Sequence, residues 1–507
     1  MGNWFKVIII GGGATGTGIL RDLALRGVDC LLLEKEDFAT GTSGRFHGLL
    51  HSGARYAVKD PHSAEECIQE NKILKQIAPG CVEDTGGLFV ATGEDDLAYS
   101  EKWLEGCKNA GIEVQEISPQ EALLEEPRLA KNIKKVYRVP DAAIDGFRLC
   151  AANVRSAEKK GAQARNYTEV IDIIKEGNKV KGVIAKDLVT GKEEEIYCDM
   201  IINAAGAWAG KIAAMAGVDV NIVPDKGVLV VFNHRFTKNV INRLRPPGDG
   251  DIFVPHGSVT IFGTTSRETT DPEDNGATKE DVLALLGEGR KLIPDLDEIR
   301  LIRAFAGVRP LYQPDGGGTG RNATRDFSLI DHEKEAGITG MVSVVGGKLT
   351  TFRLMANAVS DYVCTILKIP GESVTDQEPL VDDFCRLKPN SKKEFLCQCE
   401  QVTEDMLLEA VEGKKRISLS DVRRLTRLGM GPCQGTFCTF RAAGFYQKQK
   451  KLSVSQVNAM LEEHVQERWK GNHPVLWGGQ AQEAEITRGV YLSLLNLDKL
   501  ERCDGNV

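Results

Sequence analysis

Residues 7–27 read VIIIGGGATGTGILRDLALRG, and the stretch has three parts. Val7 to Ile10 form a continuous β-branched run, typical of a strand buried on both faces. Gly11 to Gly16 follow the pattern G-x-G-x-x-G. Over residues 17–26, apolar residues return at helical spacing, and Gly27 ends that pattern. The stretch therefore predicts a strand, a glycine turn and a helix in direct succession.

A second predicted strand, Cys30 to Leu33, ends at Glu34, about 20 residues beyond the glycines. In a dinucleotide site, Gly11 permits the tight turn, Gly13 lets a pyrophosphate approach the backbone and Gly16 lets the helix pack on the strand. The helix N-terminus attracts the phosphates, and Glu34 can accept a hydrogen bond from a ribose hydroxyl. The alternative is a glycine turn with only a structural role. An acid at position 34 disfavours a 2′-phosphate.

The bulk composition narrows the class of protein. The chain has 507 residues, of which 42% are hydrophobic and 27% charged, so it can form two to four ordinary domains. A net charge of −8 argues against nucleic acid as the main partner. No apolar run approaches the ~20 residues of a membrane span, and the N-terminus MGNWFKVIIIGGG lacks the features of a secretion signal. We therefore expect a cytoplasmic protein without a transmembrane segment. Its thirteen scattered cysteines do not resemble a disulfide framework.

Three further stretches favour FAD over NAD as the dinucleotide. Residues 35–56, KEDFATGTSGRFHGLLHSGARY, can lie along a flavin. Residues 201–210, IINAAGAWAG, read as a buried strand that breaks into small residues around Trp208, which belongs either to the core or to the cofactor site. Residues 341–356, MVSVVGGKLTTFRLMA, read as strand, Gly-Gly turn and helix start. The dipole of that helix can stabilise an anionic reduced flavin. Val342 excludes a Walker A loop, and no second G-x-G-x-x-G context for NAD is present.

In combination, these motifs resemble a known family. GGGATG, HSGARY, NAAGAW, GVRP and GGKLTTFR are similar to the D-amino-acid-oxidase-type FAD oxidoreductases, and most of all to FAD-dependent glycerol-3-phosphate dehydrogenases, over residues 5–370. The C-terminal cysteines and ERWKGNHPVLWG (467–478) resemble the large catalytic subunit in the anaerobic branch of that family.

The resemblance implies a discontinuous architecture. An α/β Rossmann-like FAD-binding domain would comprise 1–80, 145–215 and 330–370, and an inserted antiparallel α+β substrate domain 81–144 and 216–329. Residues 251–266, DIFVPHGSVTIFGTTS, agree, because they alternate like two antiparallel strands. A linker (371–392), a small helical cysteine domain (393–447) and a helical tail (448–507) would follow.

The resemblance also implies the residues that contact FAD. They are Gly11, Gly12, Gly13, Ala14, Thr15, Gly16, Glu34, Lys35, Thr42, Ser43, His47, Gly48, Val170, Ala205, Gly206, Trp208, Gly346, Gly347, Lys348, Leu349 and Thr350.

Oxidation of sn-glycerol 3-phosphate to dihydroxyacetone phosphate needs a flavin N5 that takes hydride from C2, an acceptor for the hydroxyl proton and a holder for the phosphate. Arginine suits phosphate because its planar fork matches the oxygens. The matching positions are Arg55, Arg309 and Arg325, and in the family such arginines line the substrate pocket together with Tyr56 and Lys348.

We expect His51, assisted by Lys348 or Arg309, to help remove the hydroxyl proton, because His51 matches a family histidine near the reacting centre. The spacing of His47 and His51 could also suit a metal, but no third ligand accompanies them. The chain departs from the family pattern at one position. Respiratory relatives carry a histidine after a K-G-S triplet, whereas this chain reads Lys226-Gly227-Val228-Leu229.

The cysteines at 397, 399, 433 and 438 follow the pattern C-x-C, 33 residues, C-x4-C. Between them we expect a helix over 404–412, capped by Thr403, and a second helix capped by Ser420 that runs to Leu428. This frame resembles the bacterioferritin-associated-ferredoxin-like domain, which carries a 2Fe–2S cluster on four thiolates. The predicted ligands are therefore Cys397, Cys399, Cys433 and Cys438. Zinc is the alternative, although C-x-C fits its usual C-x2–4-C knuckles poorly.

Residues 411–451 contain ten Lys/Arg against Glu412 and Asp421, a local charge of +8. Such cations can raise the potential of a cluster. They can also dock an acidic partner or an anionic membrane, or they can simply form a solvated helix face.

The resemblance implies two partners: a second subunit that contains flavin, and an iron–sulfur membrane-anchor subunit that passes electrons to quinone. Any membrane association would then come through partners. Two rival functions stay open. One is a 2-hydroxy-acid or amino-acid dehydrogenase of the same fold, for which one arginine fork suffices. The other is a non-catalytic electron-transfer subunit.

Overall fold

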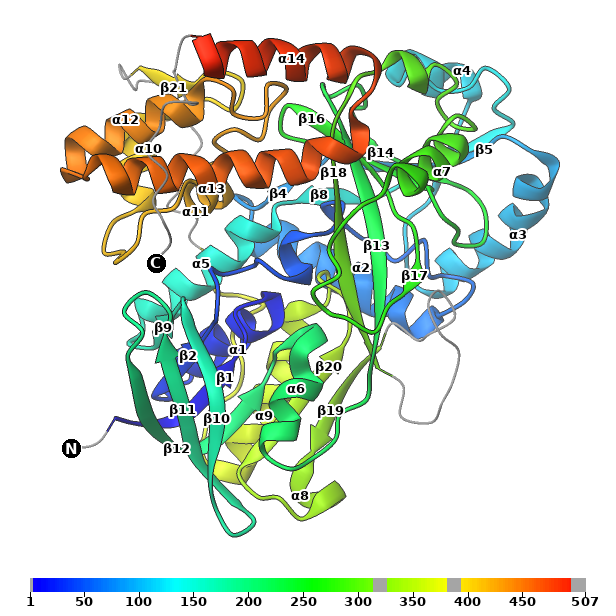
Figure 1. The fold of residues 1–507 in the computed structure, drawn as a ribbon. Helices are drawn as coiled ribbons and strands as arrows, with labels where there is room; N and C mark the ends of the chain where they lie inside the picture. Colours follow the sequence, from blue (N-terminus) through cyan, green and yellow to red (C-terminus); the bar gives the residue numbers. More distant parts are fainter. Residues whose placement is uncertain (1–2, 313–325, 381–393, 494–507) are drawn as a thin grey trace.

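A computed structural model describes residues 3–312, 326–380 and 394–493. Figure 1 shows two large sheets, one at the lower left and one at the upper right, with the C-terminal helices across the top. The first large sheet has a parallel centre in the order β9-β2-β1-β12-β20. The buried parts of its central strands are mostly apolar because helices or strands cover both faces.

The centre of this sheet is built from β1 (Trp4–Ile10), β2 (Cys30–Leu33), β9 (Gln163–Arg165), β12 (Glu193–Asn203) and β20 (Met341–Gly346). Its antiparallel additions are β10 (Thr168–Glu176), β11 (Lys179–Asp187) and β19 (Phe327–Asp331). One face carries α1 (Ala14–Leu25), α5 (Gly146–Glu158) and α9 (Phe352–Leu367). The helix α6 (Ala209–Met215) shares the opposite core with β10 and β11.

The predicted strand–turn–helix unit is present, with shifted bounds. The first strand starts at Trp4, and the second spans Cys30–Leu33 as predicted. The helix begins at Ala14 instead of residue 17, because Gly13 already occupies the N-cap and Gly16 lies inside the first turn. A Cβ on Gly16 would come within 1.9 Å of the Gly11 carbonyl oxygen, so only glycine allows this close approach of helix to turn.

The second large sheet runs in the order β17-β13-β16-β15-β14-β5-β7-β6, with β18 paired to β13. The strands are β5 (Gly87–Ala91), β6 (Gln115–Ile117), β7 (Lys135–Val139), β13 (Ile222–Phe232), β14 (Val240–Arg243), β15 (Ile252–His256), β16 (Val259–Gly263), β17 (Arg267–Glu268) and β18 (Leu301–Tyr312). The antiparallel pair predicted over residues 251–266 is confirmed as β15 and β16. Around this sheet lie α3 (Glu94–Asn109), α4 (Pro119–Glu125) and α7 (Lys279–Gly289).

Smaller elements connect the two sheets. The strands β3 (Leu49–Leu50), β4 (Val82–Glu83) and β8 (Ala142–Ile144) form a short sheet next to α2 (Pro61–Ile77). The short helix α8 (His332–Ala336) links β19 to β20. The two large sheets and these connecting elements thus bring residues that are distant in sequence together between the sheets.

The C-terminal part has its own apolar core, to which Val402, Leu407, Val422 and Tyr446 contribute. Its elements are β21 (Phe395–Cys397), β22 (Val402–Thr403), α10 (Glu404–Ala410), α11 (Leu419–Thr426), α12 (Cys438–Lys450), α13 (Val454–Asn472) and α14 (Gly478–Ser493). The predicted tail helix is confirmed as α13, which adds Val457, Met460 and Leu461 to this core.

The cap predicted for the second helix is wrong. Ser418, not Ser420, caps α11, because the Ser418 side chain accepts the Ser420 N–H at 3.1 Å. The helix also ends earlier than predicted, at Thr426, since Arg427 turns into the left-handed region. Within the described part of the chain, no helix combines the length and the apolar character needed to cross a membrane.

Candidate functional site

A cavity of about 860 Å³ opens between the first large sheet and the second. Nearly all residues predicted for cofactor and substrate line it, including Glu34, His51, Arg55, Arg309 and Lys348. Gly16 and Gly48 do not, since Gly16 packs on Gly11 and Gly48 faces His256 behind the wall. Arg325 lies outside the described residues. Segments that are far apart in sequence therefore converge on one cavity.

The glycine turn and Glu34 form one end of this cavity. Gly11 has a φ of 110°, and a Cβ there would come within 2.6 Å of the Ala204 carbonyl oxygen. The Glu34 carboxylate accepts the N–H groups of Gly12 at 2.7 Å and of Glu36 at 2.9 Å. Burial raises the pKa of Glu34, although these two hydrogen bonds oppose the rise. Each carboxylate oxygen has a second acceptor position, so Glu34 can still accept a ribose hydroxyl.

Glu273 holds the rim of the cavity, and no motif in the sequence pointed to it. Its carboxylate accepts hydrogen bonds at 2.8 Å from both Lys35 Nζ and Trp208 Nε1. Lys35 Nζ also lies 4.7 Å from the centroid of the Trp208 ring. Trp208 is therefore a rim residue and not part of a sealed core. An isolated acid in a loop has no characteristic spacing, so only the fold could reveal this contact.

Arg55 occupies the other end of the cavity. Its Nη2 donates to Asp251 Oδ2 at 2.8 Å and to the Gly248 carbonyl at 3.3 Å. Its Nη1 is buried and makes no hydrogen bond with any described residue. Arg245 donates to the same Asp251, from Nε at 2.8 Å. Burial opposes ionisation of Asp251, but the two arginines outweigh it and lower its pKa.

Arg309 is fixed by the pairing of β13 with β18. This register places Asp225 opposite Arg309, and the two form an ion pair. Arg309 Nη2 also donates to the Thr265 carbonyl at 3.1 Å. Gly227 makes room, because a Cβ there would come within 2.4 Å of Arg309 Nη2. Leu229, at the position where respiratory relatives carry histidine, is buried in an apolar cluster and cannot replace that histidine.

His51, Tyr56 and Lys348 lie together between the two ends. The His51 backbone N–H donates to Thr350 Oγ1 at 3.2 Å, and the rings of His51 and Tyr56 have centroids 5.2 Å apart. Lys348 Nζ donates to Ser63 Oγ at 2.8 Å and lies 5.5 Å from the Tyr56 centroid. Lys348 lines the cavity wall and is thus not a surface lysine.

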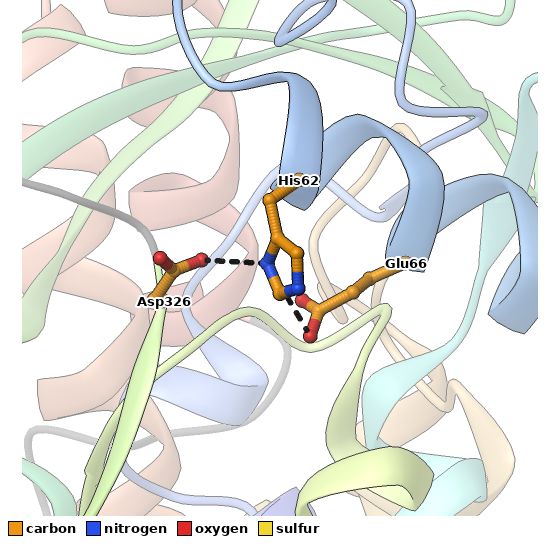
Figure 2. A group of neighbouring side chains, drawn as sticks. All are labelled: His62, Glu66 and Asp326. Carbon is orange, nitrogen blue, oxygen red and sulfur yellow. Dashed lines mark ion pairs between the residues drawn. The ribbon is translucent and has the colours of Figure 1, made fainter. Parts of the chain in front are cut away.

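His47 is held in the neutral form. Its Nδ1 accepts the Leu49 N–H at 3.1 Å, so the proton of the neutral ring is on Nε2. Burial, with the charges of Arg55 and Arg309, lowers the pKa of His47 to about 3. Among the described residues, the one group of three or more possible metal ligands within 4.8 Å of one another is His62, Glu66 and Asp326, and His47 and His51 are not in it. Figure 2 shows that group, in which the exposed His62 lies 3.8 Å from Glu66 and 3.7 Å from Asp326.

The four predicted cysteine ligands converge in the C-terminal part. Cys397 ends β21, Cys438 begins α12, and the Sγ atoms of Cys397 and Cys399 are 3.7 Å apart. The neighbouring thiols of Cys399 and Cys438 lower the pKa of both Cys397 and Cys433. The four thiols therefore form a ring of neighbours. The remaining described cysteines are buried free thiols, and Cys385 and Cys503 lie outside the described residues.

Comparison with known proteins agrees with this geometry. Residues 6–353 match the family model described as FAD dependent oxidoreductase, and the chain belongs to that family. Within it, the chain is 43% identical to the A1 subunit of anaerobic glycerol-3-phosphate dehydrogenase from Haloferax volcanii, over 97% of this chain and 91% of the relative. It is 41% identical to the corresponding subunit of the anaerobic enzyme from Escherichia coli K12, over 98% of both chains.

A solved structure also shares the fold. The glycerol-3-phosphate dehydrogenase from Bacillus halodurans, complexed with FAD, matches with a TM-score of 0.57 at 22% identity, over 99% of this chain and 96% of that one. We therefore name the cavity between the two large sheets the flavin cavity.

Proposed function

We propose that this chain oxidises sn-glycerol 3-phosphate to dihydroxyacetone phosphate with FAD as the hydride acceptor. The observation that carries the proposal is Arg55, which lines the flavin cavity and whose buried Nη1 has no hydrogen-bond partner among the described residues, because a buried donor without a partner is costly until a ligand satisfies it. Arg309 and Lys348 line the same cavity, so a dianion there meets three cations. The names of the relatives at 41–43% identity agree with this substrate.

The FAD, when bound, supplies the acceptor for hydride from C2. The glycine turn and Glu34 would hold its diphosphate and ribose, and the Gly346–Thr350 turn would face its ring. The donors of Arg55, together with Arg325, would bind the phosphate. Asp225 holds the Arg309 guanidinium in place, so the geometry is set before the substrate arrives. His51, anchored through its backbone to Thr350, would accept the hydroxyl proton with help from Lys348.

The rival substrates fit less well. A 2-hydroxy acid or amino acid needs one arginine fork for its carboxylate, and three cations around one cavity exceed that need. A non-catalytic electron-transfer subunit has no use for an arginine whose buried donor awaits a ligand. Both rivals predict a flavin that glycerol 3-phosphate does not reduce.

The cysteine segment supports a 2Fe–2S cluster as the second cofactor. Two sulfurs on one tetrahedral metal at ~2.3 Å lie roughly 3.8 Å apart, and Cys397 and Cys399 are 3.7 Å apart. A mononuclear zinc site would bring all four sulfurs within that distance. The four thiols do not form such a compact group among the described residues. Four neighbouring thiols that are less compact than a zinc site leave room for a two-iron cluster.

We also propose partner subunits that pass the electrons to quinone and supply any membrane association. Several basic residues of the stretch 411–451 form ion pairs with acids of the same chain. Lys415 pairs with Asp187, Arg416 with Glu463 and Arg424 with Asp37. Among the described residues of this stretch, the exposed cations that form no ion pair are Arg441, Lys448 and Lys450 on α12, followed by Lys451. An acidic partner would therefore dock on α12.

One experiment tests substrate and cofactors together. The protein is purified without oxygen, its visible spectrum is recorded, and glycerol 3-phosphate is added without an acceptor, with lactate as the control. We expect the flavin band to bleach and the iron–sulfur absorption to fall with glycerol 3-phosphate alone. Bleaching without iron would leave the dehydrogenase and remove the cluster. An unchanged flavin would remove glycerol 3-phosphate as the substrate.

A further inference from the structure

A second cavity, of about 550 Å³, lies between the flavin cavity and the four-cysteine segment. The two cavities share part of their wall, including Thr40, Arg45 and Phe46. On its far side, the second cavity reaches Arg427 and Gln434, the latter next to Cys433. The cysteine segment thus lies directly behind residues 40–48, which we name the flavin-site loop.

Arg427 joins three parts of the chain at this place. Its Nε donates to Glu400 Oε2 at 2.7 Å, and its Nη2 donates to the His256 carbonyl at 3.3 Å. Its Nη1 lies 3.7 Å from Asp145 Oδ2. Glu400 follows Cys399, His256 ends β15, and Asp145 is the N-cap of α5. The side chain is only 12% exposed, so its removal would leave buried carboxylates without a counter-charge.

The backbone at Arg427 is in a left-handed conformation that is unusual for arginine. Arg427 is the C-cap of α11 with a φ of 67°, a left-handed position that glycine or asparagine normally fills. Gly257 opposite leaves space for the guanidinium, because a Cβ there would come within 2.4 Å of Arg427 Nη2. A costly backbone conformation that persists around a buried side chain points to a function of that side chain.

The turn His256–Ser258 touches both redox sites. On one side, a Cβ on Gly48 of the flavin-site loop would come within 3.2 Å of His256 Nδ1. On the other, Ser258 Oγ donates to Glu400 Oε1. Gly431 lies against the same place, since a Cβ there would come within 2.4 Å of Cys399 Sγ and 3.1 Å of Ser258 Oγ. Within the described chain, this turn connects the flavin-site loop to Glu400, the residue that follows Cys399.

We propose that Arg427 is a positioning residue that docks the cysteine segment on the flavin-site loop and thereby sets the rate of electron transfer from flavin to cluster. The proposal rests on the proposed function, because it needs both cofactors. With both cofactors bound, two electrons would leave the reduced flavin one at a time, its protons would pass to solvent, and each electron would convert one ferric to one ferrous iron. An added one-electron acceptor reoxidises the cluster between the two transfers. Electron transfer slows steeply with distance, so a looser dock slows this step alone.

The test compares Arg427→Gly and Arg427→Lys with Lys415→Ala. Arg427→Gly removes the guanidinium and also relieves the left-handed strain, so the end of α11 is kept. Lys415 also joins the C-terminal part to the rest of the chain, through an ion pair with Asp187 at the end of β11. The Lys415 side chain is 74% exposed, and such an exposed ion pair contributes little to stability. In anaerobic stopped-flow mixing with glycerol 3-phosphate, we expect unchanged flavin bleaching in all variants. Cluster reduction should slow at least tenfold in Arg427→Gly, less in Arg427→Lys and not in Lys415→Ala.

An unchanged rate of cluster reduction in an iron-loaded Arg427→Gly protein would overturn the proposal. Equal slowing of flavin bleaching and of cluster reduction would overturn it too. Hydrogen exchange on metal-free protein gives a readout that does not depend on the cluster. We expect faster exchange over residues 252–260 in Arg427→Gly and wild-type exchange in Lys415→Ala. Unchanged exchange would contradict the docking. A wild-type protein that binds no iron would contradict the proposed cluster, while the exchange data would still decide the docking.

Discussion

Arg55 donates a hydrogen bond from Nη2 to Asp251 at 2.8 Å, while its buried Nη1 has no hydrogen-bond partner among the described residues. The first contact fixes the guanidinium, and the second atom is what a phosphate oxygen would satisfy. Arg55→Lys keeps the charge but removes the fork. A charge-assisted hydrogen bond contributes about 1.5–3 kcal/mol, so KM for glycerol 3-phosphate should rise ~10- to 100-fold. Steady-state kinetics measure this.

Arg245→Lys is the matched control for that variant. Arg245 donates to the same Asp251 at 2.8 Å but does not line the flavin cavity. Its replacement should leave KM nearly unchanged. A rise in KM that is equal for both variants would show that Asp251, and not the free nitrogen of Arg55, determines substrate affinity.

His51→Asn tests the proton acceptor. The side chain lines the flavin cavity beside Tyr56, and its backbone contact with Thr350 survives the substitution. Loss of a general base lowers turnover by roughly 10²- to 10⁴-fold. We expect that fall in kcat with a full complement of FAD, measured by absorbance before the assay. His62→Asn, on an exposed residue, should keep wild-type turnover. A His51→Asn enzyme that retains most of its kcat would rule out this role.

Gly16→Ala tests the glycine turn. The new Cβ would lie 1.9 Å from the Gly11 carbonyl oxygen, so the turn or the start of α1 must move. We expect purified protein with little or no bound FAD and a lower melting temperature. Gly27→Ala is the comparison, because Gly27 has a positive φ but no atom within 4 Å of an added Cβ. It should cost about 1 kcal/mol and keep its FAD. Equal FAD content in both variants would contradict the close packing proposed for Gly16.

The sequence revealed the parts of this site that local motifs encode. The glycine turn, Glu34, the Gly346–Gly347 turn and the converging cysteines all have fixed spacings, so they could be found without a structure. Glu273, Asp225 and Asp251 could not, because each is a single acid in an unremarkable stretch and its contact with Trp208, Arg309 or Arg55 joins segments far apart in sequence. The cap of α11 was misplaced for a similar reason, since Ser418 and Ser420 are equally good caps locally. The division into domains stays a prediction.

Cys399→Ser tests the metal centre directly. Cys399 neighbours Cys397 at 3.7 Å and is the exposed member of the four. A 2Fe–2S cluster predicts two irons and two acid-labile sulfides per wild-type chain, and near-complete loss of both in the variant. Cys30→Ser, at a buried thiol in β2, should keep its iron. If the wild-type protein contains one zinc per chain and no acid-labile sulfide, the four cysteines bind zinc and not a 2Fe–2S cluster.

The buried His464 should make the folded protein less stable in acid. It is 2% exposed, and burial together with Arg423, Arg468 and Arg303 lowers its pKa to about 3. The unfolded chain binds a proton near pH 6.5 and the folded chain does not, so this group's contribution to stability is complete above pH 6.5 and is lost as the pH falls toward 3. The free energy of unfolding should fall by up to about 1.4 kcal/mol per pH unit below pH ~6.5 from this residue.

Denaturant titrations at about pH 7, 6 and 5 measure this dependence on either side of the unfolded pKa. They should show a shallower slope of stability against pH for His464→Gln than for wild type, because the variant has no ring to protonate on unfolding. His62→Gln, on an exposed ring, should follow the wild-type slope. Identical slopes for all three proteins would place the acid-sensitive group elsewhere.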